Sequence, residues 1–134
     1  MENKKNFYID GKWDTPKGEE EIKVINPATE ENCAVISLGN KDDIDLAVSS
    51  ATKAYSSWSF STKEERITLL ETLYETYKKR WEDIAEALTT EMGAPQDFAT
   101  KLHAGTGAAH LNSCLRSLTT YAFDHPMVEH PPNQ

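Results

Sequence analysis

Residues Ser61 to Pro95 read STKEERITLLETLYETYKKRWEDIAEALTTEMGAP, the longest stretch of this sequence in which apolar residues recur with a helical period. Its main apolar residues are separated by steps of three and four: Ile67, Leu70, Tyr74, Tyr77, Trp81, Ile84 and Leu88. Such steps place side chains on one stripe of an α-helix. Leu69 and Leu73 widen the stripe, so we predict that it faces a core.

Local signals mark both ends of this segment. Two overlapping capping-box sequences, Ser61-x-x-Glu64 and Thr62-x-x-Glu65, stand at its start. Gly93 favours a left-handed C-terminal residue, and Pro95 cannot continue the helical hydrogen bonds. The basic pair Lys79-Arg80 suits a helix C-terminus. The segment is therefore predicted to be one long helix or two helices that meet at this pair.

Short strands are predicted before the helices. The stretch Phe7–Trp13 is interrupted by Asp10-Gly11, a strong hairpin signal. Ile22–Ile25 reads as a second strand and Cys33–Leu38 as a third. We predict that residues 1–38 form an antiparallel β unit of two or three short strands, which needs a helix or a partner to cover it.

Two further helices are expected in the range 40–123. Asn40 is a good N-cap for a helix with this inward row: Ile44, Val48, Ala51, Tyr55 and Trp58. Pro95 suits the first position of another helix, whose apolar row is Phe98, Leu102, Gly105, Ala108, Leu111, Leu115, Leu118 and Ala122. The glycines at 105 and 107 weaken this helix and predict a close helix crossing or a kink. Residues 124–134 are predicted to be an extended linker.

Composition excludes several classes of function. The 134 residues carry a net charge of −8, which makes a nucleic acid or an anionic membrane an unfavourable partner. No segment approaches the roughly 18 apolar residues of a membrane span, and Met1–Lys5 leads into no apolar signal region. Cys33 and Cys114 lack metal or redox spacing, so we expect reduced thiols in the cytoplasm, with a disulfide as the alternative.

The residues themselves indicate no catalytic or metal site. Gly105-Thr106-Gly107 lacks the third glycine and the preceding strand of a dinucleotide loop, and we interpret these glycines as packing residues. His103 and His110 are about 10 Å apart along a helix and cannot bind one metal ion by themselves; we expect surface or interface histidines. Cys114 is predicted to pack between helices, because no base or oxyanion donor is evident beside it.

The order of several short motifs resembles the beginning of an NAD(P)-dependent aldehyde dehydrogenase. These motifs are Phe7–Trp13, Val24–Glu31, Asp45-x-Ala47-Val48-x-x-Ala51 with Ala54 and Trp58, Glu65-Arg66, and Glu91-Met92-Gly93-Ala94-Pro95. Each motif is weak alone, but their combination is specific and covers essentially the whole chain.

This resemblance implies an α/β family fold of Rossmann type, of which this chain is the mainly helical N-terminal segment, 1–134. The complete enzyme would oxidise an aldehyde to a carboxylic acid with NAD or NADP and would form a homo-oligomer. Its catalytic cysteine and glutamate and its cofactor-binding residues have no counterpart in this chain, which is expected to be inactive alone. The alternative is a free-standing acidic helical module that binds another protein.

The resemblance also implies two lesser sites. Family members hold a monovalent cation through backbone oxygens at positions that match Ile25 and Glu91; ordinary strand and helix ends are the alternative interpretation. The helix after Ala94-Pro95 lines the substrate entrance in the family, which would place Thr106 and His110 near that entrance.

Overall fold

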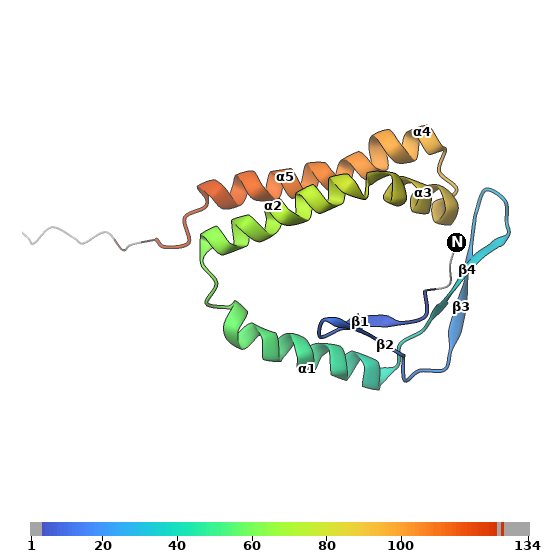
Figure 1. Ribbon diagram of the computed structural model, residues 1–134, viewed down its shortest axis with the longest axis horizontal. Coiled ribbons are helices and arrows are strands. Elements are labelled where there is room, and N and C mark those ends of the chain that lie inside the picture. Colours follow the sequence, from blue (N-terminus) through green and yellow to red (C-terminus); the bar gives the residue numbers. More distant parts are fainter. Residues whose placement is uncertain (1–3, 126, 128–134) are drawn as a thin grey trace, which may run out of the picture.

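The computed structural model describes residues 4–125 and 127, in which four short strands precede the helices. The elements form an open arch (Figure 1). One side of the arch is a helix with a β-hairpin along its inner face. The other side is a pair of long antiparallel helices, and a second hairpin joins the two sides at one end.

The first hairpin joins β1 (Phe7–Ile9) to β2 (Lys12–Asp14) in antiparallel register. Its two-residue turn is Asp10-Gly11, and both residues have positive φ, 53° and 78°. This is the backbone of a type I′ turn, which the Asp-Gly sequence favours. The predicted hairpin signal is therefore confirmed.

The second hairpin is a separate two-stranded sheet made of β3 (Glu21–Ile25) and β4 (Asn32–Ser37). The prediction of one unit of two or three strands was wrong in this respect, because the stretch 7–13 already forms a complete hairpin with its own sheet. Two small sheets result, and an isolated parallel bridge joins Lys4 to Ile36 of β4.

Helix α1 (Lys41–Trp58) begins with a reciprocal capping box between Asn40 and Asp43. The Asp43 side chain is buried and also accepts hydrogen bonds from the backbone N–H groups of Lys17 (2.8 Å) and Gly18 (3.2 Å). These hydrogen bonds to the charged form lower the pKa of Asp43, that from the Asn40 N–H most of all. One carboxylate thus fixes the start of α1 and ties it to the loop after the first hairpin.

The predicted inward row of α1 is not covered by the described part of this chain. Ile44 is 60% exposed, Val48 59% and Tyr55 69%. Their spacing correctly indicates a helix, but the surface that would bury them is absent from these residues.

The long segment forms two helices, α2 (Lys63–Lys79) and α3 (Trp81–Met92), which meet at Arg80. The two-helix alternative is therefore right. Thr62 and Glu65 make the capping box at the start. The whole predicted stripe is half-buried, whereas Leu69 and Leu73, predicted to widen it, are 52% and 47% exposed.

Beyond Pro95, the chain forms a short helix α4 (Gln96–Phe98), a π-helical turn η1 (Ala99–His103) and helix α5 (Ala104–Thr120). Pro95 is the N-cap residue, one position earlier than predicted. The π turn inserts an extra residue into the helical repeat. The buried positions at the start of the row consequently shift to Ala99 and Ala104, and Phe98 and Leu102 are exposed, whereas Ala108 of the predicted row is buried.

Helices α2, α3 and α5 pack closely because small residues lie between them. Tyr77 donates a hydrogen bond to the carbonyl of Ala104 (2.9 Å), and Trp81 Nε1 donates one to the carbonyl of Thr100 (3.1 Å). The space beside Gly107 is filled by the Tyr77 ring. The predicted close helix crossing is therefore confirmed at Gly107, whereas Gly105 has only an ordinary contact with Trp81.

The buried apolar side chains of the described residues are all alanines: Ala34, Ala85, Ala99, Ala104 and Ala108. Large apolar side chains stay at least partly exposed, which is unusual for a single folded chain. No helix among the described residues is long and apolar enough to cross a membrane.

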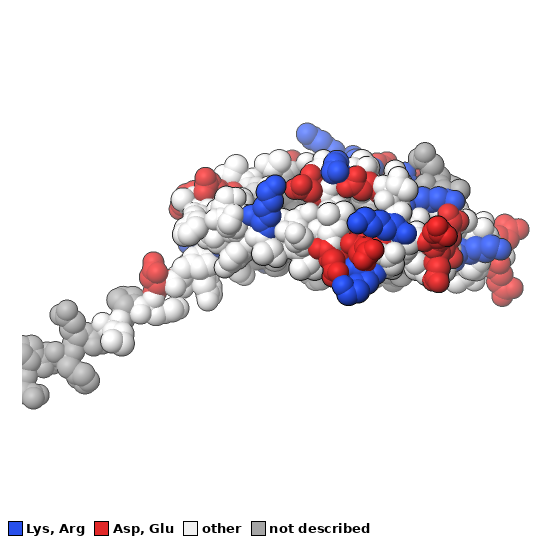
Figure 2. All heavy atoms as spheres, turned by 90° about the horizontal axis from the view of Figure 1, so that it is seen from below, with Lys and Arg blue, Asp and Glu red and all other residues white. Residues whose placement is uncertain are grey.

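Charged side chains of both signs are interspersed on the face drawn in Figure 2. That face carries no extended field of one sign of the kind that attracts a nucleic-acid backbone. Of the predicted linker 124–134, the structure describes Asp124, His125 and Met127, which have no regular secondary structure; the remaining positions lie outside the described residues.

Candidate functional site

The turn after β3 lies against the C-terminus of α3. Within this turn, the side chain of Asn26 accepts a hydrogen bond from the N–H of Ala28 (2.9 Å), and its backbone N–H bonds to the carbonyl of Glu31 (2.9 Å). Glu30 has a positive φ of 60° and closes the turn by donating to the carbonyl of Asn26 (2.8 Å). The Asn-Pro-Ala-Thr-Glu sequence thus builds a tight turn by local hydrogen bonds.

Gly93 is the point at which the helix meets this turn. It ends α3 in the left-handed conformation, with φ 66°, as predicted. A β-carbon at this position would lie 2.9 Å from the β-carbon of Ala28 and 3.1 Å from Cγ of Pro27. Only a glycine satisfies both the backbone conformation and this close approach.

Two sequence-predicted cation positions flank this junction. Ile25 ends β3 immediately before the turn and is 47% exposed, and Glu91 lies two residues before Gly93 with an exposed side chain. The structure therefore brings together the two stretches that contain them, although they are far apart in sequence. Among the described residues, side chains alone form no metal-binding group of three or more His, Cys, Asp or Glu.

The two predicted substrate-entrance residues share one exposed face of α5. Thr106 and His110 are four residues apart, one turn of helix, and both are exposed. The Thr106 hydroxyl donates to the carbonyl of Leu102 (2.9 Å) within the helix. This face is opposite to the alanine row that packs on α2.

Cys114 lies one turn after His110 and is also exposed, so the prediction that it packs between helices was wrong. Cys33 is half-buried in β4, and its thiol donates to the carbonyl of Val24 (3.3 Å). Both thiols are free. Of the two histidines predicted to be surface or interface residues, His110 is exposed and His103 is half-buried against Phe98, with its Nδ1 buried without a partner among the described residues.

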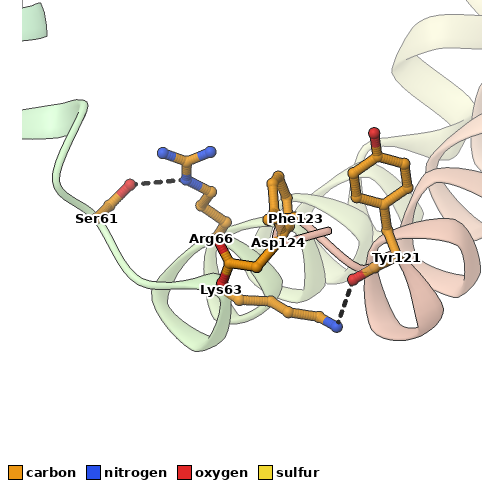
Figure 3. A pocket seen from close by; sticks show the side chains of 6 residues that line it. All are labelled: Ser61, Lys63, Arg66, Tyr121, Phe123 and Asp124. Carbon is orange, nitrogen blue, oxygen red and sulfur yellow. Dashed lines mark hydrogen bonds between the residues drawn. The ribbon is translucent and has the colours of Figure 1, made fainter. Parts of the chain in front are cut away.

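A pocket that the sequence did not indicate lies between the start of α2 and the segment after α5 (Figure 3). It has a volume of about 380 Å³ and is lined by Ser61, Lys63, Arg66, Tyr121, Phe123 and Asp124. Lys63 Nζ donates to the carbonyls of Thr119 (2.8 Å) and Tyr121 (3.1 Å), which ties the end of α5 to the start of α2. Lys63 and Arg66 are three residues apart and therefore share one face of α2, but this spacing alone does not indicate a pocket.

The described residues do not form a cofactor site of the dinucleotide type. Gly105 and Gly107 lie within α5, where the Tyr77 and Trp81 rings are their nearest neighbours. No strand leads into them, so their N–H groups are not presented at the start of a helix as a phosphate would require.

Comparison with known proteins identifies one family. The sequence model of the aldehyde dehydrogenase family matches residues 13–130. A 3-succinoylsemialdehyde-pyridine dehydrogenase from a Pseudomonas species is 41% identical over 128 residues, which are 95% of this chain and 27% of that protein.

Solved structures agree with this match. The crystal structure of an aldehyde dehydrogenase from Bartonella henselae superimposes with a TM-score of 0.93 at 39% identity, over 98% of this chain and 28% of that one. Aldehyde dehydrogenase C from Pseudomonas syringae was solved as a C291A mutant with NAD+ and octanal. It superimposes with a TM-score of 0.88 at 35% identity, over 92% of this chain and 25% of that one. The chain spans about a quarter of the length of these relatives.

Proposed function

The chain belongs to the aldehyde dehydrogenase family, and we propose that it is the N-terminal part of an enzyme that oxidises an aldehyde to a carboxylic acid with NAD+ or NADP+. The observation that supports this most is the match along almost the whole chain, at 39% identity and a TM-score of 0.93, to a solved aldehyde dehydrogenase. The presence of NAD+ and octanal in the Pseudomonas syringae structure supports the classes of cofactor and substrate.

The described residues would act as a scaffold in such an enzyme. They contain no paired nucleophile and base, and their glycines are committed to helix packing. The cofactor would supply the acceptor for the hydride, and it would be held by residues other than those described here. We therefore expect the 134-residue chain alone to be inactive.

The activity test compares two proteins from the same gene. The 134-residue chain and the product of the complete reading frame are each incubated with octanal and NAD+ or NADP+, and reduced nicotinamide is followed by absorbance. We expect turnover only in a longer product that continues into a Trp-Asn-x-Pro motif and a later cysteine. Turnover by the 134-residue chain would overturn the scaffold assignment.

The exposed apolar side chains support burial of this chain against other protein. On α1 the exposed row is Ile44, Val48, Tyr55 and Trp58. Exposed rows of this size are normally covered in a stable protein. We propose that the remainder of the enzyme and a second copy in a homo-oligomer cover them, and that the isolated chain self-associates. A clean monomer in sedimentation velocity would contradict self-association.

We also propose that the junction near Gly93 holds a monovalent cation through backbone oxygens around Ile25 and Glu91. The close contact of Gly93 with Ala28 supports this, because it brings the two stretches together. Hard oxygen ligands suit such an ion. A rise in the midpoint of thermal unfolding with potassium or sodium, but not with tetramethylammonium at equal ionic strength, is expected; equal effects of all three salts would refute the site.

We propose that the exposed face containing Thr106 and His110 faces the substrate entrance of the complete enzyme. Their one-turn spacing on the face of α5 away from α2 supports this position. Replacing His110 by Leu in the complete enzyme should then change KM for aldehydes of different length more than kcat. Unchanged relative KM values would argue against it.

A further inference from the structure

The pocket beside Arg66 contains a cation without a counter-ion. Arg66 is half-buried, its Nε donates to Ser61 Oγ (2.8 Å), and its Nη2 donates to the carbonyl of Ser59 (3.4 Å). Neither partner is charged, and no carboxylate among the described residues lies within ion-pair distance of Arg66. The guanidinium is thus held in place, while its Nη1 has no hydrogen-bond partner among residues 4–125 and 127.

A second positive charge lies in the same wall. Lys63 Nζ is fixed by two backbone carbonyls at the end of α5, which are also uncharged. Asp124 is the one acidic residue of the lining, so the lining carries two positive charges and one negative charge. This local excess of positive charge contrasts with the net charge of −8 of the chain.

The remaining wall of the pocket is aromatic. The rings of Tyr121 and Phe123 pack edge to face with centroids 5.0 Å apart, and the two side chains are 58% and 53% exposed. In Figure 3 the side chains of Phe123 and Arg66 both border the pocket. A ligand here would meet a planar cationic donor and an apolar ring surface.

We propose that this pocket binds a small organic acid, with its carboxylate on Arg66 and its apolar body against Phe123. A guanidinium is the side chain best suited to a carboxylate, because its planar donors match the two oxygens. The charge of Lys63 adds to the attraction, and the volume of about 380 Å³ accommodates a body of the size of a benzene ring. The site is independent of the cation junction and of the α5 face proposed above.

The test uses benzoate as the probe and the whole 134-residue chain. Binding is followed by ¹H–¹⁵N correlation spectra, in which we expect the resonances of Arg66, Tyr121 and Phe123 to shift in a saturable manner. Benzamide has the same ring without the charge and should bind about tenfold or more weakly. Equal binding of benzamide and benzoate, or shifts confined to residues outside the pocket, would overturn the proposal.

Substitutions then locate the site. Arg66→Gln should weaken benzoate binding about tenfold or more. Arg66→Lys should weaken it to a smaller extent, because lysine keeps the positive charge but lacks the planar pair of donors of the guanidinium. Lys79→Gln, an exposed lysine at the other end of α2, is the charge-matched control and should bind as the parent does. Equal weakening by the control would mean that only net charge matters.

The contribution of the Phe123 ring is measured separately, by comparing benzoate with acetate. Phe123→Leu should reduce the preference for benzoate over acetate without abolishing acetate binding. Should Arg66→Gln fail to fold by circular dichroism, the benzoate and benzamide comparison on the parent chain still decides the matter. Sedimentation velocity at saturating benzoate tests whether the occupant of the pocket is instead a second copy of the chain. If the pocket is free to bind a small acid, benzoate leaves the distribution of oligomeric species unchanged.

Discussion

The ring of Tyr77 occupies the space in which a side chain at Gly107 would begin. A β-carbon at position 107 would lie 2.7 Å from Tyr77 Cζ and closer still to the hydroxyl oxygen, which donates to the carbonyl of Ala104. One residue on α2 and one on α5 thus set the separation of the two long helices. The close packing of these two helices therefore requires both a glycine at position 107 and a tyrosine at position 77.

Gly107→Ala should therefore destabilise the chain. The added methyl group forces the Tyr77 ring away and breaks its hydrogen bond, at a cost of about 1–3 kcal/mol for overpacking. Urea unfolding followed by circular dichroism measures the change. Gly105→Ala is the matched control, because its β-carbon would be 3.9 Å from Trp81, an ordinary contact. The control should be neutral or more stable by up to about 1 kcal/mol; equal losses in both variants would contradict the steric explanation.

Gly93→Ala should destabilise the junction between α3 and the turn after β3. The left-handed conformation alone costs a residue with a β-carbon about 1–2 kcal/mol, and the overlap with Ala28 adds to that cost. Gly11→Ala separates the two causes, because Gly11 has φ 78° but no atom within 4 Å of its added β-carbon. The free energy of unfolding should fall more for position 93 than for position 11. A larger loss of unfolding free energy for Gly11→Ala than for Gly93→Ala would refute the contribution of the contact between position 93 and Ala28.

Trp81→Phe tests the hydrogen bond to the π turn. The substitution keeps a ring but removes the Nε1–H that bonds to the carbonyl of Thr100. A net loss of about 1 kcal/mol is expected, together with faster amide exchange across 99–104. Trp58→Phe is the control, since this tryptophan is 47% exposed and no hydrogen bond of its indole is described. Unaltered exchange in the π turn would show that Trp81 does not hold it.

Asp43 should make stability depend on pH. Its pKa is lowered below the ordinary value of 3.8 by N–H donors of Asn40, Lys17 and Gly18. A group whose pKa is lower in the folded state stabilises the fold fully above its unfolded pKa, and this contribution is lost as the pH falls through the lowered value. Asp43→Asn should therefore lower the unfolding midpoint at pH 7 and reduce the difference between pH 7 and the acid limit. Asp42→Asn, on the exposed side of the same turn, should keep the parent profile.

The local features of the fold were predictable because neighbouring residues determine them. The Asp10-Gly11 turn, the Thr62 capping box and the left-handed Gly93 depend on hydrogen bonds and backbone preferences within a few residues. The stripe from Ile67 to Leu88 identified both the helices and their covered face. The break at Arg80 followed from the basic cluster, although the sequence left one helix as an alternative.

Contacts between distant segments required the tertiary structure. The sequence predicted an uninterrupted row through Phe98 and Leu102, but the π turn moves the buried positions to Ala99 and Ala104. Periodicity cannot show such an inserted residue, because the interaction that accompanies it, Trp81 with Thr100, comes from another helix. The pocket beside Arg66 depends on the packing of the end of α5 against the start of α2, which no local pattern in the sequence indicates.

The sequence alone determined the family, the starts of α1 and α2, the left-handed end of α3 and the Asp10-Gly11 turn, since these depend on short motifs and local hydrogen bonds. The tertiary structure decided which apolar faces are covered, since coverage depends on a partner surface and not on spacing. It also brought Ala28 against Gly93 and assembled the Arg66 pocket from segments more than 50 residues apart. Long-range packing, which has no period along the chain, is the physical reason for the difference.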